Sequence, residues 1–514
     1  MCGIYCRYSR CDSNQDFSKS YNLIRHRGPD NTKIEHLSNH LFVFHRLAIC
    51  GLDDTSNQPF IHNNHILICN GEIYNHKQLQ HDENIVCTSN SDCEIIIHLY
   101  IKYGIRKTLE LLDGVFAFVI YNITNDNLII ARDPIGIRSL FFTQNRSNIV
   151  ISSEAKGLDS EDNAYQFPPG FYMDKGMLHK YYEHTYTLHD HSYDMMLQNI
   201  RSLLESSVQK RMMSDRPIAC LLSGGLDSTL ITALVKKYSK TPLETYSIGL
   251  EGSTDLKYAK IAADYLDTTH HTIIVSEKTF LNAIDSTIQQ IESFCTTTVR
   301  ASVGNYLVSK FIRDNSNNRV IFCGDLSDEL FGSYRGFQNT DSRDEFMTAN
   351  VKMLEDVHYF DVLRSDKTIS GASLEARVPF ADISFVKYVM GISPEYKMFS
   401  NEKMEKYILR DAFRDLLPPE LLWRRKEAFS DGVSDVSRSW FEIIREFVDL
   451  QISDDDYEKL REKYTYLKPY DKESLYYREI FEKYYPGKAH MIPYFWRHPF
   501  SENQDPSARL LDNY

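Results

Sequence analysis

The segment at 217–228 restricts the fold of this chain more than any other part of the sequence. It reads Pro-Ile-Ala-Cys-Leu-Leu-Ser-Gly-Gly-Leu-Asp-Ser. The continuous apolar run is typical of a strand that is buried on both faces of a parallel sheet. The Ser-Gly-Gly turn then enters a predicted helix at 228–238, and backbone N–H groups at such a turn favour phosphate oxygens. We therefore expect an α/β domain whose turn binds a phosphorylated ligand.

The spacing of this turn excludes two common nucleotide-binding motifs. No lysine follows it, so it lacks the γ-phosphate contact of a GxxxxGK[ST] loop, and it is not a dinucleotide-binding GxGxxG sequence. Further segments alternate between strand and helix character: 245–250, 256–266, 271–275, 280–291 and 319–323. This alternation predicts a doubly wound sheet that binds its ligand at the carboxyl ends of strands, near Ile248 and Gly324.

Composition limits the partners of the chain. Its 514 residues include 58 Lys or Arg and 71 Asp or Glu, which gives a net charge of −13. That balance argues against a protein that coats nucleic acid or an anionic membrane. No apolar run approaches the ~18 residues of a transmembrane helix, and the first residues lack the features of a secretory signal. We expect a cytoplasmic protein of two to four domains.

Cys2 has a chemical role open to it that the other nine cysteines lack. Aminopeptidases generally remove Met1 before a small residue, which leaves a thiol and a free α-amino group on Cys2. The amine, with an ordinary pKa of about 7.7–8.0, is then an adjacent base for the thiol, whose ordinary pKa is about 8.5. Two alternatives stand beside this interpretation. One is a chemically idle terminus, and the other is a metal site at Cys2, Cys6 and Cys11, which no CxxC pair or His cluster completes.

Four short motifs further along the sequence favour the interpretation of Cys2 as a nucleophile. They are Arg-His-Arg-Gly-Pro-Asp at 25–30, His-Arg-Leu-Ala-Ile at 45–49, Ile-Leu-Ile-Cys-Asn-Gly-Glu-Ile-Tyr-Asn at 66–75 and Ser-Asp-Cys-Glu at 91–94. The third reads as an apolar strand that ends at Asn70 and Gly71, where we expect a turn whose amide and backbone N–H point at an oxyanion. Ser91 or Asp92 is a plausible cap for a helix that runs to Tyr103.

In this order behind Cys-Gly-Ile, these strings resemble the N-terminal-nucleophile class of glutamine amidotransferases. The resemblance implies an αββα sandwich that hydrolyses glutamine, with Cys2 as nucleophile and Asn70 and the Gly71 N–H as the oxyanion hole. It also implies that glutamine contacts Arg46, Leu47, Ala48, Ile49, Cys50, Asn70, Gly71, Glu72 and Asp92. Composition shifts near residue 190, so we expect a glutaminase domain at 2–190 and an ATP-dependent domain at 191–514.

The chain as a whole resembles the asparagine synthetase family, which joins this glutaminase to a pyrophosphate-releasing, adenylating domain of the doubly wound α/β type. Four further strings carry the resemblance: 297–302, 374–382, 423–432 and 505–509. It implies that ATP and Mg²⁺ activate aspartate as a β-aspartyl-AMP, that channelled ammonia then makes asparagine, and that no cofactor is permanently bound. A homodimer is compatible with it.

The same resemblance implies roles for particular residues of the second half. ATP would contact Leu222, Ser223, Gly224, Gly225, Asp227, Ser228, Ile248, Cys323 and Gly324. Asp227 and Asp328 would hold the metal ion. Thr297, Arg300 and Lys426 would face the aspartate or phosphate charge, and Asp325 would direct ammonia.

One string departs from the family pattern. Where the family has Ser-Gly-Glu-Gly-Ser-Asp-Glu, this chain reads Cys-Gly-Asp-Leu-Ser-Asp-Glu at 323–329. The side chain of Asp325 is one methylene shorter than the glutamate of the family pattern. Leu326 stands where the glycine of that pattern would allow a positive φ. A displacement of ~1 Å costs up to about 100-fold in rate. A slower synthetase, a different carboxylate acceptor and a glutaminase without synthetase activity therefore stay open, and the intact Asp328 and Glu329 favour a working enzyme.

Overall fold

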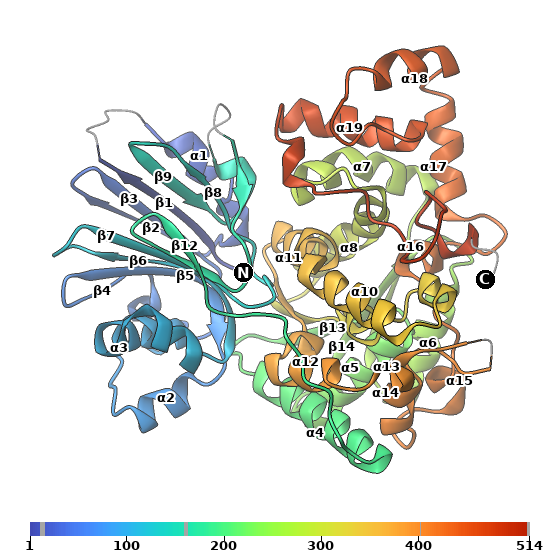
Figure 1. Ribbon diagram of the computed structural model, residues 1–514, viewed down its shortest axis with the longest axis horizontal. Coiled ribbons are helices and arrows are strands. Elements are labelled where there is room, and N and C mark those ends of the chain that lie inside the picture. Colours follow the sequence, from blue (N-terminus) through green and yellow to red (C-terminus); the bar gives the residue numbers. More distant parts are fainter. Residues whose placement is uncertain (11–15, 159–162, 401, 511–514) are drawn as a thin grey trace. The chain divides into compact units, whose positions relative to one another are not determined.

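The computed structural model describes residues 1–10, 16–158, 163–400 and 402–510, so Cys11 lies outside the described residues. The chain forms two compact units (Figure 1). The first unit comprises 1–183, 213–217 and 370–375, and the second comprises 184–212, 218–369 and 376–514. Within the described ranges, no helix combines the length and the apolar character needed to cross a membrane.

The first unit contains two six-stranded antiparallel sheets. The first sheet has the order β10-β8-β9-β1-β3-β2, with β10 Tyr165–Gln166, β8 Phe141–Gln144, β9 Asn148–Ser152, β1 Gly3–Ser9, β3 His40–Arg46 and β2 Asn31–Leu37. The second has the order β12-β11-β7-β6-β5-β4, with β12 Met177–Lys180, β11 Phe171–Asp174, β7 Asn127–Arg132, β6 Gly114–Asn122, β5 His65–Ile73 and β4 Phe60–His62.

Apolar side chains from both sheets form one core. Ile4 and Phe44 of the first sheet pack with Ile68 and Val119 of the second, so the sheets lie face to face. Helices α2 (His76–Asp82) and α3 (Ile95–Leu111) cover the other face of the second sheet. On the first sheet, the short α1 (Ser18–Asn22) leads into a 3₁₀ turn at Arg25–Arg27 that contacts β1 and β3. The predicted αββα sandwich is confirmed.

Two local predictions for this unit need correction. The chain does not turn at Asn70 and Gly71, because β5 continues through both and pairs them with Ala117 and Phe116 of β6. Gly71 serves close approach instead, since a Cβ there would lie 2.5 Å from the Val115 carbonyl oxygen. The helix predicted to end at Tyr103 continues to Leu111 across a kink at Gly104, and Ser91 caps its entry turn.

The second unit is built on a five-stranded sheet of order β15-β14-β13-β16-β17, whose first four strands are parallel. The strands are β13 Ile218–Leu221, β14 Glu244–Gly249, β15 Thr269–Ile274, β16 Val320–Phe322 and β17 Glu375–Arg377. From β13 the chain winds outward to β15 and then returns to place β16 on the other side of β13. That reversal is the switch point where doubly wound sheets bind ligands, and the predicted fold class is confirmed.

Helices surround this sheet and build the rest of the second unit (Figure 1). The early ones are α4 Tyr193–Arg211, α5 Leu226–Tyr238, α6 Thr254–Leu266, α7 Glu277–Ile291, α8 Thr296–Asn315, α9 Ser327–Phe331, α10 Arg343–Asp356 and α11 Asp361–Gly371. The later ones are α12 Ile383–Met390, α13 Pro394–Lys397, α14 Tyr407–Ala412, α15 Pro419–Leu422, α16 Phe429–Gly432, α17 Trp440–Asp449, α18 Asp454–Arg461 and α19 Lys472–Tyr484.

Candidate active sites

Cys2 lies at the start of β1 and is fixed through its thiol and its carbonyl. The Cys2 thiol donates to the Leu47 carbonyl oxygen at 3.6 Å, and the Cys2 carbonyl accepts from Arg27 Nε at 3.0 Å. The predicted nucleophile and one predicted glutamine contact are therefore neighbours. Burial raises the pKa of the Cys2 thiol to about 11, so the thiol needs a nearby base to react at neutral pH.

The free α-amine of the chain belongs to Met1, the residue before Cys2. The Met1 α-amine is buried, donates to the Leu374 carbonyl oxygen at 3.0 Å, and has its pKa lowered by burial to about 6. While Met1 is present, the nitrogen of Cys2 is an amide and cannot accept a proton. Removal of Met1 would transfer the free amine to Cys2 itself, as the nucleophile interpretation requires.

Asn70 presents an unpaired amide inside the first unit. Its side chain is only 1% exposed, and neither its Nδ2 nor its Oδ1 has a hydrogen-bond partner among the described residues. A buried amide without partners costs about 1–3 kcal/mol, so it is expected where a ligand supplies the partner. A donor reserved in this way is what an oxyanion hole requires.

We expect Asn70→Ala to lower kcat for glutamine hydrolysis about 10²–10³-fold, because one of the donors to the oxyanion is lost. Steady-state glutamate release measures the effect. Asn127→Ala is the matched control. Asn127 lies in the same sheet, but its side-chain amide already donates a hydrogen bond to Asp174 at 2.8 Å. An Asn70→Ala enzyme with unchanged kcat would remove Asn70 from the oxyanion hole.

Acidic and thiol groups gather beside Asn70. Cys50, Glu72 and Asp92 bring their side-chain donor atoms within 4.8 Å of one another, and the Cys50 thiol donates to Glu72 Oε2 at 3.5 Å. Asp92 also fixes the strand, because its Oδ2 accepts from the Ile73 N–H at 2.7 Å. A carboxylate pair here suits the ammonium of an amino-acid substrate.

Arg46 is less available than the sequence predicts. Its guanidinium donates to the carbonyl oxygens of Gly51 and Asp53 and to the Asn57 side chain, so it braces the turn after β3. Ala48 is also fixed, since its N–H donates to Asp30 at 2.9 Å. Ile49 is buried in the same segment. The contact of Arg46 with glutamine stays a prediction.

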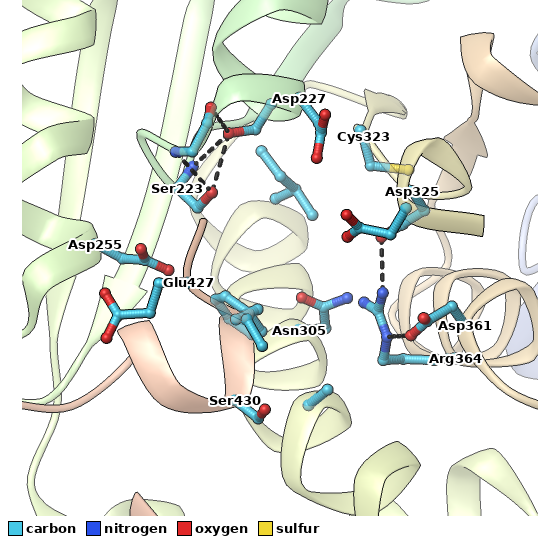
Figure 2. Close-up of a pocket in the computed structure, with 18 of the residues that line it drawn as sticks. Ser223, Asp227, Asp255, Asn305, Cys323, Asp325, Asp361, Arg364, Glu427 and Ser430 are labelled. Atoms are coloured by element: carbon cyan, nitrogen blue, oxygen red, sulfur yellow. Dashed lines mark hydrogen bonds and ion pairs between the residues drawn. The ribbon is translucent and has the colours of Figure 1, made fainter. Parts of the chain in front are cut away.

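A cavity of about 210 Å³ lies at the switch point of the second unit (Figure 2). Most of the predicted ATP, metal and aspartate residues line it: Leu222, Ser223, Gly225, Asp227, Ser228, Ile248, Thr297, Cys323, Gly324, Asp325, Asp328 and Lys426. They come from the ends of β13, β14 and β16, from the first turns of α5, α8 and α9, and from a loop before α16. They converge because the carboxyl ends of parallel strands meet at one edge.

Asp227 and Asp328 share one cation in the structure. Lys406 Nζ lies 2.5 Å from Asp227 Oδ2 and 2.6 Å from Asp328 Oδ1. Burial opposes ionisation of Asp328, yet the ammonium groups of Lys406 and Lys426 hold the pKa of its carboxyl well below the ordinary value. The two carboxylates are therefore close enough to share one cation. No sequence motif pointed to Lys406.

Asp325 is held by a buried arginine. Arg364 Nη2 donates to Asp325 at 2.7 Å and Nε donates to Asp361 at 3.0 Å (Figure 2). The Ser365 hydroxyl also donates to Asp325. The short side chain is thus fixed at the cavity wall.

Leu326 keeps the left-handed backbone conformation that the glycine pattern requires. Its φ is +78°, it is 1% exposed, and its side chain lines the cavity. For an L-residue with a side chain, this backbone conformation costs about 1–2 kcal/mol of conformational free energy. The departure therefore leaves the loop geometry in place, at the cost of strain, and adds an apolar side chain to the cavity wall.

We expect Leu326→Gly to be more stable than Leu326→Ala by about 1 kcal/mol, because both lose the buried side chain but only glycine relieves the positive φ. This reverses the usual order of alanine and glycine. Urea unfolding of the two variants measures the difference. A higher free energy of unfolding for Leu326→Ala than for Leu326→Gly would mean that the backbone at position 326 is unstrained.

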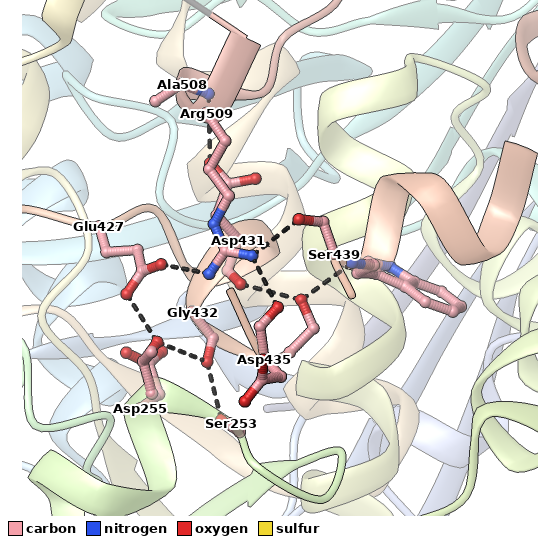
Figure 3. A network of polar contacts seen from close by, with 12 residues as sticks. Ser253, Asp255, Glu427, Asp431, Gly432, Asp435, Ser439, Ala508 and Arg509 are labelled. Carbon is pink, nitrogen blue, oxygen red and sulfur yellow. Dashed lines mark hydrogen bonds and ion pairs between the residues drawn. The ribbon is translucent and has the colours of Figure 1, made fainter. Parts of the chain in front are cut away.

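Lys426 lies in the cavity and its loop is anchored by charged contacts. Its Nζ is 2.9 Å from Asp328 Oδ1 and 4.4 Å from the centre of the Tyr334 ring. The neighbouring Glu427 accepts from Arg509 and from Thr254. Figure 3 shows this network, in which Arg509 reaches Glu427, the Asp435 carbonyl and Ser439. The anchors fix the backbone that carries Lys426.

Two predicted residues lie outside the cavity lining that the structure describes. Gly224 supports the turn behind it, with φ +73° and no room for a Cβ against the Tyr258 backbone. Arg300 forms two-point ion pairs with Glu473 and Asp505, at 2.7–2.9 Å. Its guanidinium thus holds α8, α19 and the segment near 505 together, and its contact with substrate stays a prediction.

Several cavity residues carry no sequence signal. They are Asp255, Asn305, Tyr334, Asp361, Arg364 and His498, and they line the cavity together with Glu329 of the 323–329 string. Burial, followed by the charges of Asp361 and Asp328, raises the pKa of Glu329 well above its usual range. His498 Nε2 pairs with the Pro506 carbonyl at 3.0 Å, while its buried Nδ1 has no partner in the part of the chain described.

Comparisons with known proteins agree with both halves of this geometry. A family described as "Glutamine amidotransferase domain" matches residues 1–216, and one described as "Asparagine synthase" matches 199–352 and 338–507. Glutamine-hydrolysing asparagine synthetases of Gallus gallus, Cricetulus griseus and Homo sapiens are 39%, 38% and 37% identical to the chain. Each alignment covers 100% of this chain and 99% of the relative. The chain therefore belongs to the family of glutamine-hydrolysing asparagine synthetases.

Proposed function

We propose that the chain converts ATP, L-aspartate, L-glutamine and water into AMP, diphosphate, L-asparagine and L-glutamate. The observation that supports this most is the cavity at the switch point. It combines the Ser-Gly-Gly turn, the Asp227 and Asp328 carboxylates and the Lys426 ammonium in a chain of this family. We also propose residues 2–190 as the glutaminase domain, 191–514 as the synthetase domain and the cytoplasm as the compartment.

The glutaminase reaction begins at Cys2 after Met1 is removed. The free α-amine of Cys2 takes the thiol proton, and the thiolate attacks the glutamine amide carbon. Asn70 and the Gly71 N–H stabilise the oxyanion that forms, and the amine returns the proton to the departing ammonia. Water then releases glutamate and restores the thiol. Arg46, Leu47, Ala48, Ile49, Cys50, Glu72 and Asp92 are the proposed contacts of the amino-acid part of glutamine.

The synthetase reaction places ATP at the turn after β13. Leu222, Ser223, Gly224, Gly225, Asp227, Ser228, Ile248, Cys323 and Gly324 are the proposed ATP contacts. The aspartate β-carboxylate attacks the α-phosphorus, and diphosphate leaves while Lys426 neutralises the charge. Ammonia from the glutaminase reaction then attacks the acyl carbon, loses a proton and displaces AMP. Asp325 is proposed to direct the ammonia, and Thr297 and Arg300 to face the aspartate or phosphate charge.

Mg²⁺ is the metal ion that this site suits. Asp227 and Asp328 supply hard oxygen ligands, and the shared Lys406 ammonium indicates that one cation fits between them. The bound ion would neutralise charge on the phosphates that leave. We propose ATP as a substrate that binds together with Mg²⁺, and no permanently bound cofactor.

Release of diphosphate from ATP tests the proposal. We expect release that requires aspartate and proceeds with either glutamine or ammonium. Release with another carboxylate, and none with aspartate, would favour a related ligase with a different acceptor. Glutamate release without aspartate-dependent diphosphate release would indicate a glutaminase with an impaired synthetase step. Asp325 and Leu326 would then be the first candidates for the cause of that impairment.

A further inference from the structure

The outer face of the second sheet in the first unit carries a thiol, a carboxylate and an imidazole in one place. Cys87, Glu94 and His98 bring their ligand atoms within 4.8 Å of one another. Glu94 ends the 3₁₀ turn before α3 and His98 follows four residues later, so both lie on one helix face. None of the three is among the proposed glutamine contacts.

We propose that Cys87, Glu94 and His98 bind a divalent transition-metal ion of the zinc type. Thiolate sulfur, imidazole nitrogen and carboxylate oxygen are the donors that Zn²⁺ takes, whereas Mg²⁺ and Ca²⁺ prefer oxygen alone. One thiolate and one carboxylate balance the two charges of the ion, which leaves the partly buried site neutral. Binding displaces the thiol proton of Cys87 to solvent.

The spacing of two ligands already suits a tetrahedral ion. His98 Nε2 lies 3.3 Å from Glu94 Oε1, which is long for a hydrogen bond. Two donors at about 2.0–2.1 Å from a tetrahedral zinc ion are separated by roughly 3.4 Å. An ion therefore replaces this contact with little movement of α3, and the sulfur of Cys87 closes the third position.

The loop that carries Cys87 is fixed to the same carboxylate. Glu94 accepts from the backbone N–H and the hydroxyl of Thr88, both at 2.8 Å, and from those of Ser89 at 2.7 and 2.5 Å. Ligating carboxylates in metal sites are commonly held by hydrogen bonds of this kind. The site is thus assembled before any ion binds.

His62 supplies a candidate fourth ligand. It ends β4, and its ring centre lies 4.4 Å from that of His98. A rotation of the His62 side chain would complete a site of two imidazoles, one thiolate and one carboxylate. The ion would then join β4, the loop at 87–89 and α3, next to the segment that carries Asp92.

Cobalt(II) is the probe, because it replaces Zn²⁺ and reports thiolate ligation by a charge-transfer band. The full-length enzyme, treated with chelator and dialysed, is titrated with Co²⁺. We expect one equivalent to produce the thiolate band, and Zn²⁺ to remove it. Cys87→Ser should lose the band and weaken binding by about 100-fold or more, and His62→Asn should keep the band with binding weakened roughly tenfold.

Cys50→Ser is the matched control, because Cys50 belongs to the other cluster of ligand atoms, with Glu72 and Asp92. We expect it to keep both the band and the affinity. Thermal unfolding gives a second measurement, in which a cooperative transition shows that each variant folds. Zn²⁺ should raise the thermal midpoint of the wild type and of Cys50→Ser but not that of Cys87→Ser. A wild type without the band, a band retained in Cys87→Ser, or a band lost in Cys50→Ser would overturn the proposal.

Discussion

Cys2→Ala is expected to lower glutamine-dependent asparagine formation by about 10⁴-fold or more and to leave ammonia-dependent formation within about twofold. The large loss follows because no other group replaces a nucleophile that forms a covalent intermediate. Cys2 belongs to the first unit, whereas the residues that line the nucleotide cavity all belong to the second. The two nitrogen sources therefore separate the two reactions.

Asparagine formation is measured in one preparation with glutamine and then with ammonium as the nitrogen source. The ammonium reaction serves as the internal control for folding and for the synthetase step. Equal loss of both activities would refute the division of labour between Cys2 and the nucleotide cavity. Intact mass is measured alongside, because the mechanism also requires the wild-type enzyme to have lost Met1.

Lys426→Gln is expected to lower aspartate-dependent diphosphate release about 10²–10³-fold. The Lys426 ammonium lies in the cavity 2.9 Å from Asp328, and it is the proposed counter-charge for the α-phosphorus. Loss of one such fixed charge from a reacting centre commonly has an effect of this size. Glutamine hydrolysis should stay close to the wild-type rate.

Lys310→Gln is the control for this variant, since Lys310 is an exposed lysine at the far end of α8 from Thr297. Diphosphate release at saturating ATP and aspartate separates a loss in kcat from a rise in KM. A pure KM effect would assign Lys426 to substrate binding alone, and an unchanged rate would remove it from the mechanism.

The sequence predicts those parts of the second unit that depend on short-range patterns. The apolar run, the Gly224 turn and the following helix form β13 and α5 close to the expected positions. Because neighbouring parallel strands end at one edge, Ser223 and Cys323 meet although 100 residues separate them. The convergence of the predicted ATP residues therefore follows from the fold class.

The remaining site residues depend on contacts that no local pattern encodes. Lys406 joins Asp227 and Asp328 from a loop 179 residues beyond the first of them. Arg300 is a free charge in the sequence, but the structure pairs it with Glu473 and Asp505, 173 and 205 residues away. Choice of partner at such distances is made by tertiary packing, which periodicity and motif spacing do not report.

Asn70 shows the same limit within a single strand. An Asn-Gly pair at the end of an apolar run is a common hairpin signal. Nine paired positions between β5 and β6 override that preference, because the continuous ladder satisfies the backbone of β5 along its β6 edge. The predicted turn at Asn70 and Gly71 was therefore wrong, while the oxyanion role of Asn70 stays a prediction.

The segment with Pro506 and Ala508 completes the wall of the cavity at the switch point, and Arg509 ties the Lys426 loop to this segment. During synthesis on the ribosome, every other part of that wall emerges earlier. A nascent chain therefore cannot complete this cavity until Ala508 has left the exit tunnel. A chain interrupted before Pro506 lacks these two wall residues and the Arg509 anchor of the Lys426 loop.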